Sequence, residues 1–187
     1  MRPGSTRGFT LIELLIVVAI IGIIAAIAVP GLLRARMSGN EASAIASLRA
    51  INSSQQAFHS GCGNGFYASE LSQLAVVPGG TGPPFISPDL GAGAPSVIKS
   101  GYTIQMSAAT DGEAGQADSC SQPDGGPAAA DLISAYYVFA DPVTEGSTGV
   151  RFFYTNTLGT VYFDSATLSA ETAGHSTPAV VTGGPLQ

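Results

Sequence analysis

The stretch that decides the fold is RGFTLIELLIVVAIIGIIAAIAVP, which runs from Arg7 to Pro30. Between Phe9 and Val29 it carries a single formal charge, that of Glu13. A helix of this length spans about 31 Å at ~1.5 Å per residue, which is enough to cross the hydrocarbon core of a membrane. The run is apolar on all sides, whereas a soluble amphipathic helix keeps one polar face. The stretch therefore predicts a membrane helix or a helix that becomes wholly buried in an assembly.

A cleavable secretory signal is the competing interpretation of the same stretch. The small residues at 25–28 (AAIA) would then form its cleavage site. The apolar run is long for a signal, however, and a helical pattern follows Pro30 where a signal would be followed by a loop. Arginines lie on both sides of the run, so the flanking charges leave its orientation in the membrane open.

Glu13 is the exceptional residue of the run. A carboxylate inside an apolar helix is costly unless it is paired, so such a residue is a candidate for a function. The alternative is that Glu13 lies among the hydrated headgroups, because it is only four residues from Phe9. That alternative is favoured for a membrane protein that stays on its own.

The junction Gly8-Phe9-Thr10-Leu11-Ile12-Glu13 follows a short basic leader and precedes a long apolar run that a proline closes. In these features the chain resembles the type IV pilin and pseudopilin family, and most of all a bacterial type IV pilin with a class III prepilin-type leader. The resemblance covers Arg7 to Pro30. It implies that a membrane aspartyl peptidase removes residues 1–8 by cutting between Gly8 and Phe9. This prepilin peptidase is then expected to methylate the new amino group of Phe9.

The resemblance also implies the path of the subunit after the cut. Residues 9–29 would hold it in the inner membrane, as a single-pass precursor with its body outside. An inner-membrane assembly platform would then extract subunits into a helical homopolymer, the cell-surface pilus, whose core is a bundle of these helices. Glu13 of one subunit would face the amine of Phe9 on its neighbour, because a buried carboxylate and a buried ammonium are each costly alone but offset one another as a pair.

Gly22 and Pro30 are the weak points of the predicted helix. Proline lacks a backbone donor and kinks or breaks a helix, and glycine lowers helix propensity. The family often loosens the stretch between two such positions in the filament, so the resemblance implies loosening of residues 22–30. A plain kink at Pro30 is the alternative.

The predicted fold class is α+β, with a long N-terminal helix packed on a small antiparallel sheet, as in the pilin fold. The helix should cover residues 9–60, with an apolar front half and an amphipathic rear half, and end at the His59-Ser60-Gly61 turn. In the rear half, apolar residues recur with the spacing of one helical face. These residues are Ala42, Ile45, Leu48, Ile51 and Phe58.

Residues 61–187 are predicted to form a globular region with an antiparallel sheet and a flexible tail beyond Asp164. Ser69 is expected to cap a short helical turn, and residues 76–100 read as a Pro/Gly-rich loop. Three strand predictions follow from β-branched and aromatic runs. They are a first strand at 102–106, a central strand at 135–140 ended by Asp141-Pro142, and a hairpin of 150–154 with 160–163.

Cys62 and Cys120 are the two cysteines of the chain. A disulfide between them is plausible if the body lies outside the cytoplasm, and two free thiols are the alternative. Residues 108–131 contain five acidic residues and no basic one. Their oxygens could bind Ca²⁺, and some pseudopilins bind calcium in a loop, but without an EF-hand spacing a solvated, mobile loop is the favoured interpretation. No other cofactor is expected.

Charge and motifs exclude several functions. The chain has 13 acidic and 7 basic residues without a basic cluster, so we expect no nucleic-acid binding by this domain alone. The stretch 63–68 (GNGFYA) fits a dinucleotide fingerprint, but it follows a helix and is better read as a turn. His59 and His175 lie in no metal-ligand cluster, and no hydrolase, metalloprotease or P-loop motif occurs. We therefore expect that the protein is not an enzyme.

Three functions remain from the sequence. The first is a type IV pilin that forms a surface filament, and the second is a pseudopilin of a type II secretion system. The third is a membrane-anchored binding domain, against which the processing junction argues, because a simple tether needs no such site. The helix after Pro30 lacks the tyrosine- and acid-rich end associated with major pseudopilins, which favours the pilin.

Overall fold

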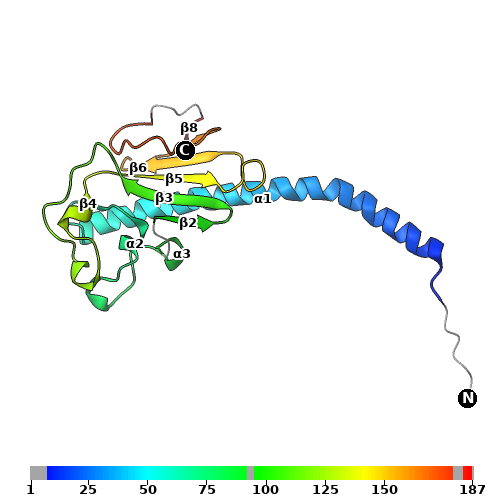
Figure 1. Ribbon diagram of the computed structural model, residues 1–187, viewed down its shortest axis with the longest axis horizontal. Coiled ribbons are helices and arrows are strands. Elements are labelled where there is room, and N and C mark those ends of the chain that lie inside the picture. Colours follow the sequence, from blue (N-terminus) through cyan, green and yellow to red (C-terminus); the bar gives the residue numbers. More distant parts are fainter. Residues whose placement is uncertain (1–7, 92–94, 179–182, 187) are drawn as a thin grey trace, which may run out of the picture. The chain divides into compact units, whose positions relative to one another are not determined.

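The computed structural model describes residues 8–91, 95–178 and 183–186, and Figure 1 shows its elements. Apart from Gly8, the predicted leader at 1–8 lies outside the described residues. The chain divides into two compact units, of which the first ends at Arg36 and the second begins at Met37. One helix, α1 (Leu11–Gly61), contributes to both units and confirms the predicted long N-terminal helix.

In the first unit, α1 is apolar and its side chains are exposed. The large hydrophobic side chains from Phe9 to Leu33 have exposed fractions between 46% and 81%. The helix contains a window long and apolar enough to cross a membrane, and none of that window is buried. Gly22 and Pro30 both lie inside α1. Pro30 has no backbone N–H to donate to the carbonyl four residues earlier, so the helix lacks one hydrogen bond at this point. The loosening of residues 22–30 in a filament stays a prediction.

In the second unit, the rear half of α1 packs on the core. Leu48, Ile51 and Phe58 are fully buried, as predicted from their spacing. Ala42 is exposed, however, and Ala44 is buried in its place. The apolar pattern alone placed the buried face slightly wrongly, because that face also carries polar residues, which are described below.

The main sheet is antiparallel throughout, which confirms the α+β prediction. Its strand order is β2-β3-β5-β6-β7-β8, and a separate two-stranded sheet pairs β1 with β4. The strands of the main sheet are β2 (Ser96–Lys99), β3 (Tyr102–Ala108), β5 (Tyr136–Pro142), β6 (Phe152–Asn156), β7 (Val161–Asp164) and β8 (Gly184–Leu186). Those of the small sheet are β1 (Tyr67–Ala68) and β4 (Leu132–Ile133).

The inner face of the main sheet forms the core with α1. Side chains alternate between the two faces of a strand, so every second residue of β3 and β5 points inward. The inward residues are fully or almost fully buried in one hydrophobic cluster with the helix: Tyr102, Ile104, Met106, Tyr136, Val138 and Ala140.

The central strand and the hairpin are found where they were predicted. β5 lies between β3 and β6, and β6 pairs with β7 around a turn in which Gly159 has a φ of 75°. The predicted strand boundaries were off by one or two residues, since β6 begins at Phe152 and not at residue 150. Asp141 and Pro142 were predicted to end the central strand but belong to it. They are the last residues of β5, where they pair with Thr103 and Tyr102.

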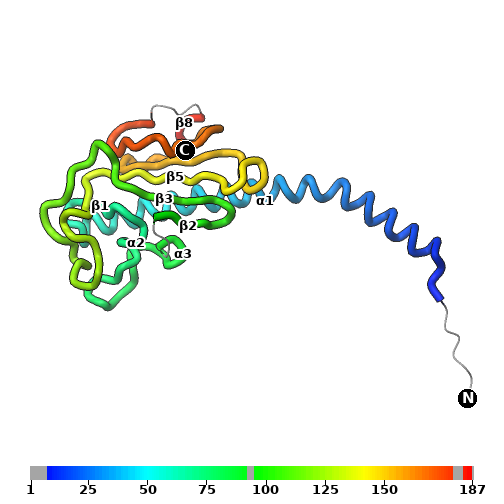
Figure 2. The backbone as a smooth tube through the Cα atoms, in the orientation of Figure 1, coloured from blue at the N-terminus to red at the C-terminus, as the bar shows by residue number. Residues whose placement is uncertain are grey.

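Two predictions about loops were also wrong. The strand at 102–106 is not the first of the sheet, since β2 precedes it inside the predicted loop 76–100. The region beyond Asp164 is not simply a flexible tail: Figure 2 shows the chain returning to the sheet, where β8 pairs with β7. Both strands lie at edges and have three or four residues, too few for a period-two pattern to be recognised.

Short helical turns complete the second unit. They are α2 (Leu71–Leu74), α3 (Pro88–Gly91), and the 3₁₀ turns η1 (Pro78–Gly80), η2 (Gln122–Asp124) and η3 (Ala129–Asp131). The predicted cap of α2 was one residue off, because Glu70 and not Ser69 is its N-cap. Gln73 Oε1 accepts hydrogen bonds from the backbone N–H groups of both residues, at 2.9 Å from Ser69 and 3.3 Å from Glu70.

Candidate functional site

The predicted processing junction is an accessible, non-helical peptide. Gly8 and Phe9 are exposed and precede the first residue of α1, Leu11. Among the described residues, no atom beyond Gly8 and its chain neighbours lies within 4 Å of the position that a Cβ of Gly8 would occupy, and 75% of Phe9 is exposed. A peptidase needs a peptide bond that is free of helical hydrogen bonding, and the bond between these two residues meets this requirement.

Glu13 is held at the start of α1 by Thr10. The Thr10 hydroxyl oxygen accepts a hydrogen bond from the backbone N–H of Glu13 at 3.3 Å, and the hydroxyl lies 3.4 Å from Glu13 Oε2, to which it donates. The Thr-x-x-Glu spacing is that of a helix capping box. A carboxylate is also favoured at a helix N-terminus by the helix dipole. The sequence analysis missed this local role, although the spacing was visible.

Glu41 attaches α1 to the sheet region through Arg151, and the sequence analysis did not identify it. Its carboxylate accepts from Arg151 Nε at 2.8 Å and lies 2.7 Å from Arg151 Nη2. The backbone N–H groups of Val150 and Arg151 donate to its other oxygen at 3.1 and 3.4 Å. Burial raises the pKa of Glu41, but the Val150 N–H and the Arg151 guanidinium lower it by more, so the net pKa lies below its usual value.

Two buried amides complete the attachment of the helix. Asn52 Nδ2 donates to Thr155 Oγ1 at 2.9 Å, and Asn52 Oδ1 accepts from the Tyr136 hydroxyl at 3.0 Å. Gln55 Nε2 donates to the carbonyl of Ala68 at 2.7 Å, and Gln55 Oε1 accepts from its N–H at 3.1 Å. These two positions continue the helical spacing of the buried apolar residues, which is the signal that could have revealed them.

The end of α1 is tied to the acidic loop. Cys62 and Cys120 form a disulfide bond, and the backbone N–H of Cys120 donates to the carbonyl of Cys62 at 2.9 Å. Within the loop, Asp118 accepts from the backbone N–H of Ala129 at 2.8 Å. Among the described residues, no three His, Cys, Asp or Glu side chains gather into a metal-binding group. Calcium binding there stays an untested hypothesis.

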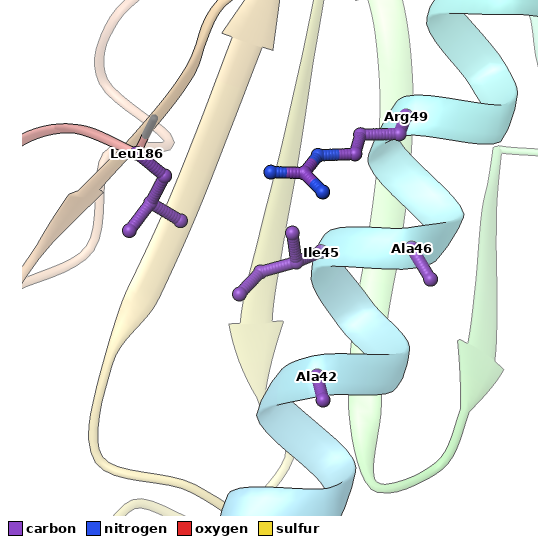
Figure 3. Close-up of a pocket in the computed structure, with 5 residues that line it drawn as sticks. All are labelled: Ala42, Ile45, Ala46, Arg49 and Leu186. Carbon is purple, nitrogen blue, oxygen red and sulfur yellow. The ribbon is translucent and has the colours of Figure 1, made fainter.

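An open groove lies beside the rear half of α1. It has a volume of about 540 Å³ and is lined by Ala42, Ile45, Ala46, Arg49 and Leu186. Figure 3 shows Ile45 and Arg49 extending from the helix toward Leu186 of β8. Four of its five lining residues are aliphatic, which gives the groove the character of an apolar surface.

In comparison with known proteins, the residues around the predicted processing junction match a known motif. Residues 4–29 match the model of the prokaryotic N-terminal methylation motif. The type IV major pilin protein PilA of Myxococcus xanthus is 50% identical over 54 residues, which are 29% of this chain and 24% of the relative. The type IV wide pilus major component PilA4 of Thermus thermophilus is 60% identical over 37 residues, which are 20% of this chain and 28% of the relative.

The matches span about a quarter of the length of these relatives. No solved structure gives a significant match to the chain. The region that does match contains the junction, the capped Glu13 and the exposed apolar part of α1. The chain therefore carries the N-terminal methylation motif of prokaryotic prepilins, and its N-terminal region is homologous to that of type IV major pilins.

Proposed function

We propose that this chain is a structural subunit of a type IV pilus filament, processed between Gly8 and Phe9 and polymerised through its apolar N-terminal helix. The observation that carries the proposal is the methylation motif joined to an apolar helical segment whose large side chains are all exposed. Apolar surface of this extent requires lipid or other apolar helices around it, because each exposed Å² costs about 25 cal/mol relative to burial. A subunit that moves from the membrane into a helix bundle meets this requirement before assembly, with lipid around the helix, and after assembly, with other helices around it.

The proposed path begins in the inner membrane, which residues 9–29 span before assembly. Prepilin peptidase removes the leader, and the assembly platform brings subunits together. In the bundle, Glu13 of one subunit pairs with the amine of Phe9 on its neighbour. Contacts of this head-to-tail kind build an open helical polymer, which emerges as a pilus at the cell surface.

The names of the relatives support a pilus over a secretion pseudopilus, because both are named as major components of type IV pili. Neither name is that of an enzyme, and the groove beside α1 offers no catalytic group. The proposed role is therefore structural.

Mass spectrometry on filaments sheared from intact cells, beside the membrane fraction, tests the proposal. We expect the sheared material to be dominated by a chain that starts at methylated Phe9. A matched Gly8→Val variant, with a bulky residue before the cut, should stay uncut and leave the sheared fraction empty. A processed chain found only in the membrane would favour a pseudopilin. A chain that keeps Gly8, or one cut near Ala28, would overturn the assignment.

A further inference from the structure

The groove beside α1 owes its shape to small side chains and to the end of the chain. Ala42 and Ala46 lie one helical turn apart, are exposed and present only methyl groups. The opposite wall is Leu186, which β8 places there by pairing with Val161 of β7. An open surface of small and aliphatic side chains suits a helix whose side chains pack against it, as ridges enter grooves in helix packing.

The chemistry of the groove limits its occupant. Four of the five lining residues are aliphatic, and Arg49 is the only charged one. In the part of the chain that the structure describes, ion pairs are formed by Lys99, Arg151 and His175, and Arg49 takes part in none. The partner that fits this groove is an apolar helix with one negative charge. A polyanion would need several cations in the groove, and a polar small molecule would need several hydrogen-bonding groups there.

The chain itself contains such a helix. Residues 9–29 are helical from Leu11 onward, apolar on all sides and exposed, and their only charge is that of Glu13. We propose that the groove receives the part of residues 9–29 around Glu13 of a second copy of the chain, with Arg49 facing that copy's Glu13. This inference rests on the proposed function and adds the place on the body of a neighbouring subunit where the apolar segment lies.

The proposal is compatible with the pairing of Glu13 and the Phe9 amine. An ionised carboxylate has two oxygens and about four lone-pair sites, so it accepts from more than one donor. The ammonium of one neighbour and the guanidinium of another therefore share the same carboxylate. A charge held by two partners is better compensated in a dry bundle than one held by a single partner.

Photo-cross-linking in assembled filaments tests the proposal. Ala46 is replaced by p-benzoylphenylalanine in a chain expressed together with wild-type chain, so that filaments form. Trypsin leaves the apolar segment in one fragment, 9–34, because no lysine or arginine lies inside it. We expect illumination to give a dimer in which fragment 37–49 is joined to fragment 9–34. The matched control places the same residue at Ile98, which is 67% exposed on β2, at the opposite edge of the sheet, and should not capture fragment 9–34.

Charge variants supply the second measurement. Arg49→Glu should lower the yield of sheared filaments several-fold, whereas Arg49→Lys should leave it close to wild type, and both chains should be processed normally. A cross-link from position 46 to any other fragment, or only within one chain, would overturn the groove assignment while the proposed function stands. Full filament yield from Arg49→Glu would overturn the pairing. A wild-type chain that forms no filaments at all would instead refute the proposed function and this inference together.

Discussion

Glu13 has a local role in the single chain and a proposed role in the filament. In the single chain its carboxylate accepts a hydrogen bond from the Thr10 hydroxyl, and in the proposed filament its charge compensates a buried ammonium. Glu13→Gln keeps the size and the hydrogen-bonding oxygen but removes the charge. We expect this variant to be cleaved like wild type and to lose most of its filament yield, with Glu13→Ala behaving similarly. Immunoblots of processed chain and of sheared filaments measure the two effects, and normal filament yield from either variant would refute the charge-pairing role.

Asn52 shows how much a single buried polar residue contributes to the second unit. It is 8% exposed and bonds to Thr155, to the carbonyl of Gly159 and to the Tyr136 hydroxyl. Asn52→Ala should lower the free energy of unfolding by about 2–4 kcal/mol, because it leaves a cavity and removes the acceptor of the buried Tyr136 hydroxyl. Urea unfolding of a fragment covering residues 37–187 measures this loss. The neighbouring Ser53→Ala, at an exposed position, should change it by less than about 0.5 kcal/mol, and equal effects would contradict the role of Asn52.

At the scale of elements, the contact between α1 and the residues just before β6 should depend on pH through Glu41. Its folded-state pKa lies below the ordinary value of 4.5, so the ionised form stabilises the folded state. This contribution is complete above the pKa of the unfolded chain and is lost as the pH falls through the lower folded-state pKa. At pH 7, Glu41→Gln should destabilise the fragment 37–187 by about 1–2 kcal/mol.

The same variant distinguishes charge from packing at this contact. Because glutamine does not titrate, the difference in unfolding free energy between wild type and Glu41→Gln should shrink as the pH is lowered from about 5 towards about 3. Urea titrations across this range measure the trend. Glu145→Gln, at an exposed position, serves as the control and should change the free energy of unfolding by less than about 0.5 kcal/mol. A difference for Glu41→Gln that stays constant with pH would show that its ionisation does not matter.

The elements differ in how far they could be predicted from the sequence. The long helix, the central strand β5 and the β6–β7 hairpin are encoded in local patterns of apolar residues and turn residues. The attachment of the helix is not local, because Glu41 and Arg151 are 110 positions apart and a polar residue gives no sign of its partner. The edge strands β2 and β8 were missed because the patterns of three or four residues are ambiguous. In the candidate site, the junction was recognisable from its residues, whereas the groove depends on the return of the chain end.

For the whole molecule, net charge should govern how assembled filaments interact. Without Arg2 and Arg7, the processed chain keeps 13 acidic residues against five basic ones. The proposed core is apolar, so these charges would lie mainly on the outside of the filament and keep filaments apart by mutual repulsion. We expect sheared filaments to stay dispersed at pH 7 in low salt and to bundle as carboxylates are protonated in the acidic range.

Sedimentation or light scattering of sheared filaments as a function of pH measures this onset of bundling. The double variant Glu113→Gln and Asp124→Asn removes two exposed charges and should begin to bundle at a higher pH than wild type. Ser53→Ala, which leaves the charge unchanged, should bundle at the wild-type pH. Added salt should favour bundling of wild type at pH 7, because screening shortens the range of the repulsion to about 10 Å at 0.1 M. If neither salt nor the double variant moved the onset, lateral association would have to be governed by specific contacts between bodies and not by their net charge.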